Sequence, residues 1–192
     1  MLTRRMVLAA PLALCTSPAR AATWQDRLVS AAEAQIGRTV IYDPSYVRIA
    51  YPGGDVPDER GVCTDVVIRA YREGLSFDLQ KAVHEDMAAN FGAYPKHWGL
   101  KRTDRNIDHR RVPNLQAFFR RKNAKVMGGG YQAGDLVTMM LPSNLPHIVV
   151  VSAASGEDAD RPLVIHNIGA GTRREAVLDR FPITGHYRFN PD

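Results

Sequence analysis

The sequence predicts an α+β protein in which N-terminal helices pack on one face of an antiparallel sheet. Residues with helical apolar spacing occur before residue 133, and short β-rich runs separated by turn residues fill the chain after it. The connections between these runs are short, which favours antiparallel pairing of consecutive strands. Helices followed by a block of strands are typical of the α+β class.

Four segments carry the signals of helices. Thr23 and Asp26 form a capping-box pattern at the start of the first segment. The second segment begins near Cys63 and repeats apolar residues at helical spacing, with Asp65 favourably placed for the helix dipole in its first turn. The expected helices cover residues 23–37, 61–74, 78–91 and 114–122.

The sequence predicts four strands and two long irregular loops. The run "HIVVVSA" is apolar on both faces, which predicts a position at the centre of the sheet. The loops, rich in Pro and Gly or in polar residues, are residues 38–61 and 93–111. The expected strands cover residues 134–141, 147–153, 162–169 and 185–190.

Residues 1–21 resemble an export signal of the twin-arginine type, with an ordinary secretory signal as the alternative. Arg4 and Arg5 precede a short apolar segment, and Ala19-Arg20-Ala21 forms a cleavage site. Cleavage would leave a single domain over residues 22–192 in the periplasm or cell envelope. Removal of three arginines lowers the formal net charge from +5 to +2, which is too small to predict a nucleic-acid partner. The sequence also contains no apolar run long enough to predict a stable membrane span.

The first turn of the second expected helix contains a cysteine, Cys63. Signal cleavage would remove Cys15 and leave Cys63 without a disulfide partner within the chain. The backbone N–H groups and the positive dipole end of a helix stabilise a thiolate, so this position favours reactivity. A small buried cysteine with a packing role is the alternative.

A reactive thiol needs a base, and the base needs a residue that orients it. His147 begins the most apolar strand, and His166 lies on the next expected strand. Strand alternation places Asn167 on the opposite face from His166, so only one of these two residues can face the cleft. His166 and Asn167 therefore compete for the orienting role.

The motifs "GVCTDVVIRAYREG", "GDLV", "HIVVVS" and "VIHNIG" together resemble the NlpC-type branch of the papain-like cysteine peptidases. Residues 36–190 resemble more closely the YijF-like proteins, exported bacterial proteins catalogued largely as a domain of unknown function. The resemblance implies a papain-like fold with Cys63 as nucleophile, His147 as general base and His166 as the residue that orients His147. The nucleophile motif departs from the usual Asp-Cys-Ser, because Val and Thr flank the cysteine here.

Substrate-binding residues are also expected. Tyr51 resembles the tyrosine that precedes a Gly-Gly pair in NlpC-type enzymes, although its spacing is one residue shorter here. In the segment "NIDHRRVPNL", Arg110 and Arg111 suit carboxylates and Asp108 suits a free amine. The alternative is that these three residues pair with one another and brace the long loop.

The leading expectation is an exported cysteine hydrolase that cleaves an amide or peptide bond, most plausibly in peptidoglycan, through an acyl-enzyme on Cys63. Two alternatives stay open on the same fold: a papain-like acyltransferase, and a non-catalytic envelope-binding module. The sequence contains no phosphate-binding glycine loop, HExxH helix or paired-cysteine site, so it predicts no cofactor and no metal.

Overall fold

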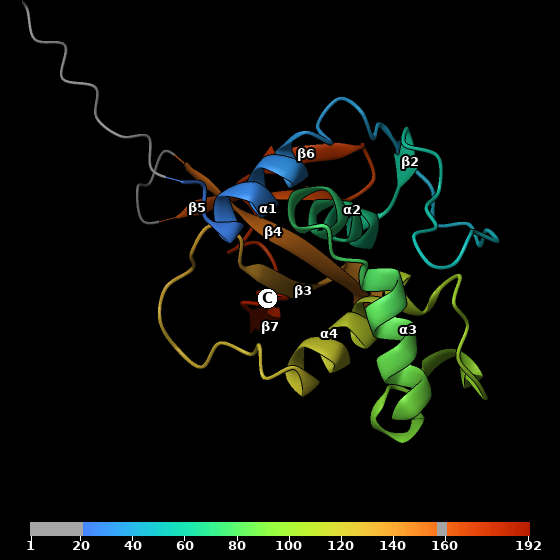
Figure 1. Ribbon diagram of the computed structural model, residues 1–192. Helices are drawn as coiled ribbons and strands as arrows, with labels where there is room; N and C mark the ends of the chain where they lie inside the picture. Colours follow the sequence, from blue (N-terminus) through green and yellow to red (C-terminus); the bar gives the residue numbers. More distant parts are fainter. Residues whose placement is uncertain (1–20, 157–160) are drawn as a thin grey trace, which may run out of the picture.

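The computed structural model describes residues 21–156 and 161–192 (Figure 1). Residues 1–20 of the expected export signal lie outside these ranges. Within them, the helices are α1 (Trp24–Glu33), α2 (Cys63–Leu75), α3 (Leu79–Ala89) and α4 (Val112–Arg121). The strands are β1 (Ile41–Tyr42), β2 (Arg60–Gly61), β3 (Leu136–Leu141), β4 (Leu145–Ser155), β5 (Pro162–Asn167), β6 (Thr172–Glu175) and β7 (Ile183–Tyr187).

The main sheet is antiparallel and has the strand order β6-β5-β4-β3-β7. The central position of β4 confirms the expectation from its two apolar faces. Strand β6 was not predicted, because its sequence "TRRE" has no apolar alternation; charged residues suit an edge strand. The short parallel pair of β1 and β2 lies within the segment that was expected to be an irregular loop.

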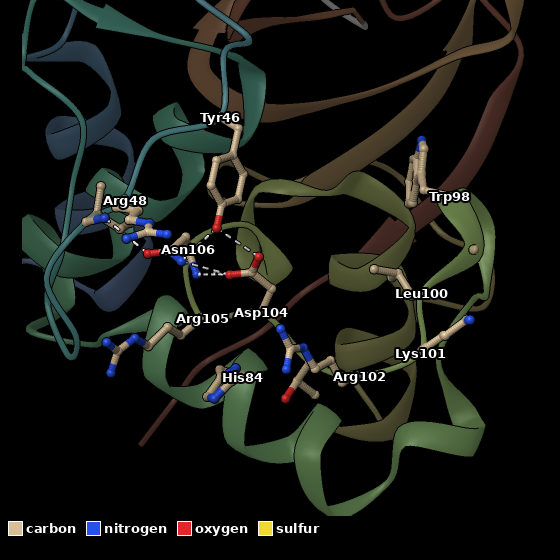
Figure 2. A pocket seen from close by; sticks show the side chains of 13 residues that line it. Tyr46, Arg48, His84, Trp98, Leu100, Lys101, Arg102, Asp104, Arg105 and Asn106 are labelled. Atoms are coloured by element: carbon tan, nitrogen blue, oxygen red, sulfur yellow. Dashed lines mark hydrogen bonds between the residues drawn. The ribbon is translucent and has the colours of Figure 1, made fainter.

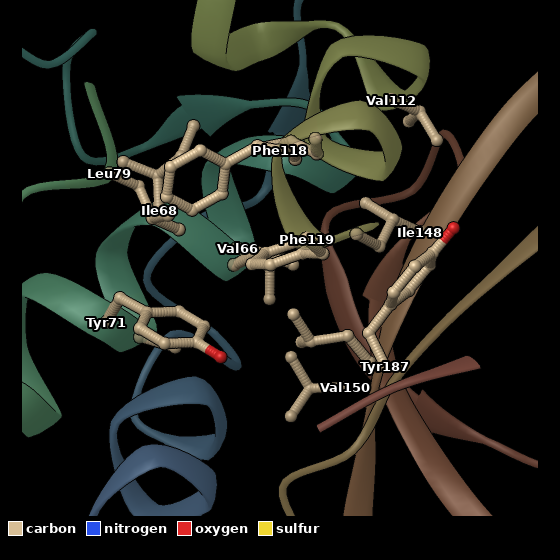
Figure 3. Packing of buried hydrophobic residues seen from close by; sticks show 14 of the residues in the cluster. Val66, Ile68, Tyr71, Leu79, Val112, Phe118, Phe119, Ile148, Val150 and Tyr187 are labelled. Atoms are coloured by element: carbon tan, nitrogen blue, oxygen red, sulfur yellow. The ribbon is translucent and has the colours of Figure 1, made fainter. Parts of the chain in front are cut away.

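Helices α1, α2 and α4 contact β4 on one face of the sheet, which confirms the α+β class (Figure 1). The core between the two layers contains Val66 and Tyr71 of α2, Phe119 of α4, and Ile148 and Val150 of β4 (Figure 3). All five side chains are at most 1% exposed, so removing any one of them would open a cavity and cost about 2–5 kcal/mol. The start of α1 also has the expected capping box.

The other face of the sheet has its own smaller apolar cluster. Val149 and Val151 of β4 lie there with Met139 of β3, and the chain after β6 covers them with Val177 and Leu178. A central strand between two cores is therefore buried on both faces, and consecutive residues of β4 enter different cores.

Arg69 of α2 is a buried arginine, 1% exposed at its side chain, and it holds the last part of the loop before α2. Its guanidinium pairs with Asp55 at 2.9 Å and donates hydrogen bonds to the backbone carbonyl groups of Val56, Pro57, Asp58 and Arg60. The segment was expected to be irregular, and Arg69 fixes its last part, residues 55–60, on the path to Cys63. No helix in the part of the chain that the structure describes is long and apolar enough to cross a membrane.

Candidate functional site

Cys63 lies in the first turn of α2, as expected, where it is the first residue, and it is almost fully buried. The carboxylate of Asp65 accepts the backbone N–H of Val62 at 2.7 Å and so caps the helix start. The cysteine lies on the wall of a small pocket of about 180 Å³. Other residues that line this Cys63 pocket include Tyr42, Pro44, Trp98, Arg110, Arg111, Pro113 and Pro146.

The surroundings of the thiol favour its neutral form. Burial raises the pKa of Cys63 to about 11, and the nearby carboxylate of Asp65 acts in the same direction. The backbone N–H groups of Ile148 and Thr64 act against this shift by bonding to the sulfur. At neutral pH the thiol is therefore protonated, which disagrees with the expectation of an activated thiolate.

His147 of β4 and His166 of β5 form a buried hydrogen-bonded pair. His147 Nε2 and His166 Nδ1 are 2.8 Å apart, and His166 Nε2 lies 3.0 Å from Glu175 Oε2 at the edge of the sheet. The carboxylate accepts the Nε2–H of His166, so His166 Nδ1 accepts the Nε2–H of His147. Burial lowers the pKa of both imidazoles, that of His147 to about 3, so both are neutral at pH 7. The expected contact between the two histidines is confirmed, and their catalytic roles stay predictions.

The predicted contact between Cys63 and His147 is absent, because the two side chains lie on opposite faces of the sheet. Ile148 packs with Cys63 in the core under the helices. Pro146, two residues earlier and therefore on the same face of the strand, lines the Cys63 pocket. Strand alternation then turns His147 towards the other face, where its cross-strand partner Met139 lies. No hydrogen bond joins the thiol to an imidazole in the described residues; the imidazole of His147 bonds to His166 instead.

Asn167, the alternative third catalytic residue, points to the helix face. Its Nδ2 donates to the carbonyl oxygen of Gly61 at 3.0 Å, and its Oδ1 accepts the N–H of Gly169 at 3.2 Å. Asn167 therefore ties the end of β5 to the segment that leads into Cys63. It forms no hydrogen bond with His147, so it has a bracing function in this structure.

Arg110 lines the Cys63 pocket, but its charge is already paired. Its Nε and Nη2 bond to the two carboxylate oxygens of Asp65 at 2.9 and 3.0 Å, and both side chains are nearly fully buried. The remaining N–H groups reach the carbonyl oxygens of Asp43 and Ser45. The expected binding of a substrate carboxylate by Arg110 is therefore not supported, because the guanidinium holds the loop and the helix start together.

Asp108 and Tyr51 also lie away from the positions expected for substrate contact. Asp108 is fully buried, and its Oδ2 bonds to His84 Nδ1 at 2.9 Å and accepts the N–H of Asp104 at 2.8 Å. Tyr51 stacks edge-on against His84 with 5.2 Å between ring centroids. Neither Asp108 nor Tyr51 lines the Cys63 pocket. Asp108 thus braces the long loop, which was the alternative, although its partner is a histidine and not an arginine.

Arg111 does line the pocket, and it leads to a residue that sequence reasoning missed. Its guanidinium lies over the ring of Trp98, 4.5 Å from the centroid. Trp98 is 58% exposed and has a left-handed backbone with φ of 64°, an uncommon conformation for a large side chain. Tyr42 was missed as well, because only the pairing of Tyr42 with Gly61 brings it beside Cys63. The exposed tryptophan in a long polar loop was the signal that could have indicated Trp98.

No group of three or more His, Cys, Asp or Glu residues in the described ranges is arranged to hold a metal ion. The fold and the site together define an α+β protein in which a helix-start thiol faces a small pocket and a histidine pair lies behind the sheet.

The chain belongs to the family described as "Domain of unknown function (DUF1287)", whose model matches residues 29–189. It is 55% identical over 166 residues to the "Uncharacterized protein YijF" of Escherichia coli (strain K12), which covers 84% of this chain and 80% of that protein. The expected YijF-like family is therefore confirmed.

Proposed function

We propose that the protein is a cell-envelope binding protein that holds part of peptidoglycan, or of another envelope amide polymer, in the Cys63 pocket. The observation that carries this proposal is the separation of thiol and imidazole by the sheet. Hydrolysis through Cys63 needs a base at the thiol. Among the described residues, His147 bonds to His166 on the opposite face of the sheet from the thiol, and the thiol stays protonated.

The composition of the Cys63 pocket supports binding. Tyr42, Trp98 and Pro146 supply apolar surface, and Arg111 supplies a charge at the rim. Ligand sites combine an apolar lining with a few polar groups in this way. A pocket of about 180 Å³ accommodates a group the size of one side chain, so the rest of the ligand would lie outside it. Export through residues 1–21 is part of this proposal, and N-terminal sequencing of the envelope-located protein should begin at Ala22.

A second candidate is the expected cysteine hydrolase or acyltransferase with a papain-like, NlpC-type fold. The position of Cys63 favours it, because the thiol lies at a helix N-terminus beside the backbone N–H groups of Ile148 and Thr64. Such donors stabilise a thiolate or an oxyanion. In this candidate the start of β4 must rearrange so that His147 reaches the thiol. In some enzymes the catalytic contacts form only when substrate is bound.

Incubation of the protein with purified sacculi separates the two candidates. For a binding protein, co-sedimentation with sacculi should persist in Cys63→Ala and fall at least tenfold in Trp98→Ala, and mass analysis should find no released fragment. Trp24→Phe provides the matched control, since Trp24 lies in α1 and does not line the pocket. Fragments that the wild-type protein releases and Cys63→Ala does not would establish the hydrolase instead.

A further inference from the structure

A second, larger cavity of about 720 Å³ lies beside the Cys63 pocket and is lined with cationic side chains (Figure 2). We call it the basic pocket. Trp98 lines both pockets, so they share a wall. The other residues of the basic pocket that matter here are Arg48, Lys101, Arg102, Arg105 and Asp104.

The cations of the basic pocket differ from most arginines elsewhere in the molecule. Among the described residues, no carboxylate lies within 4.0 Å of Arg48, Lys101 or Arg102, and these three side chains are exposed. By contrast, ion pairs with carboxylates hold Arg38, Arg60, Arg69, Arg72, Arg110, Arg121, Arg174 and Arg188. Charged groups that are left unpaired around one cavity are available to a ligand of opposite charge.

The pocket contains one carboxylate, and its place is fixed. Asp104 Oδ2 accepts the hydroxyl of Tyr46 at 3.0 Å, and Oδ1 accepts two N–H groups of Asn106 at 2.9 Å (Figure 2). These partners are neutral, so the negative charge of Asp104 persists between the cations. It would repel a compact anion such as phosphate at the centre of the pocket and would attract an amino group there.

We propose that the basic pocket binds an acidic peptide, with its carboxylates at Arg48, Lys101 and Arg102. The planar guanidinium groups suit bidentate contacts with carboxylates, and the cavity is large enough for a ligand with several separated charges. This inference rests on the proposed function, which assigns ligand binding to the neighbouring Cys63 pocket. It goes further by specifying that the ligand is negatively charged.

Isothermal titration calorimetry with penta-glutamate tests the proposal, with penta-glutamine as the neutral comparison. We expect the glutamate peptide to bind the wild-type protein at low salt and the glutamine peptide to bind at least tenfold more weakly. The double variant Arg48→Gln/Arg102→Gln should weaken binding at least tenfold, and Lys101→Glu should weaken it independently. Arg173→Gln removes an exposed arginine of β6 outside the pocket and should change the affinity less than twofold.

Three results would overturn the inference: equal binding of the two peptides, equal loss in Arg173→Gln, or tighter binding of inorganic pyrophosphate than of penta-glutamate. Thermal unfolding should be unchanged in these variants, because the substituted side chains are exposed and unpaired. Failure of penta-glutamate binding with intact binding to sacculi contradicts this inference alone. Intact penta-glutamate binding without binding to sacculi contradicts the proposed function alone.

Discussion

The two faces of the main sheet bury titratable groups by different means. On the helix face, Arg110 and Asp65 form a bidentate ion pair beside the thiol of Cys63, so charge is buried with its counter-charge. On the opposite face, His147 and His166 are buried as neutral imidazoles that share a hydrogen bond. The helix face therefore depends on keeping both partners charged, and the opposite face depends on keeping both histidines unprotonated.

Loss of one partner of the ion pair should have the largest effect. Arg110→Met leaves the carboxylate of Asp65 buried without its counter-charge, which should lower the free energy of unfolding by about 3–5 kcal/mol. Urea denaturation at pH 7 measures this loss. Arg111→Met is the matched control, and its loss should stay below about 1 kcal/mol, since its guanidinium has a ring contact and no buried carboxylate partner. Similar losses of unfolding free energy in both variants would contradict the prediction that a buried, unpaired carboxylate causes the loss in Arg110→Met.

The reactivity of the thiol tests whether the two faces are truly separate. With the pKa of Cys63 raised to about 11 by burial, alkylation by iodoacetamide at pH 7.5 should be at least roughly a hundredfold slower than that of a free cysteine. His147→Ala should leave this rate unchanged, because His147 faces away from the sulfur. Rapid alkylation that slows in His147→Ala would instead place thiol and imidazole together.

Acidification should weaken the protein through its buried neutral histidines, which include His147 on the opposite face and His109 at the end of the long loop. Burial lowers the pKa of His147 to about 3, below its unfolded value near 6.5, so between these values the unfolded chain binds more protons. Stability is then fully present above pH 6.5 and falls by at most about 1.4 kcal/mol per pH unit for this histidine. His147→Gln should reduce the slope of unfolding free energy between pH 6.5 and 4.5. His97→Gln, at an exposed position, should leave it unchanged.

The smallest effect is expected at the edge of the sheet. Glu175 bonds to His166, but its side chain is 39% exposed, so water replaces much of the interaction. Glu175→Gln should therefore cost less than about 1 kcal/mol in urea denaturation at pH 7. A loss above about 2 kcal/mol would mean that the carboxylate, and not the burial of the imidazoles, holds the pair in place.

The sequence predicted the helices, the sheet and the contact of His147 with His166, but not which face of β4 the helices cover. Helical periodicity and a short run of β-branched apolar residues are local signals, and they located α2 and the central strand. The run "HIVVV" is apolar on both faces, so its pattern contains no information about which side meets α2. Neighbouring residues of a strand point to opposite faces, so the face that α2 covers decides whether His147 or Ile148 lies beside the thiol.

The roles of the long-loop residues depended on contacts between distant segments. Arg110 pairs with Asp65, which lies 45 positions earlier, and no short motif indicates that pairing. The segment "NIDHRR" looked equally suited to binding and to bracing, and the buried positions of Asp108 and Arg110 assign it mainly to bracing. Arg111, whose guanidinium reaches the pocket rim, is the member of this set that stays available to a ligand.

The single buried arginine of α2 has a consequence for how the molecule opens. Residues 57–60 are exposed, and Arg69 binds the carbonyl groups of Val56, Pro57, Asp58 and Arg60. A segment anchored to a core helix in this way opens when the helix opens, and not as an independently fraying loop. The approach to Cys63 and helix α2 therefore form one cooperative unit, in which hydrogen exchange of the loop follows that of the helix.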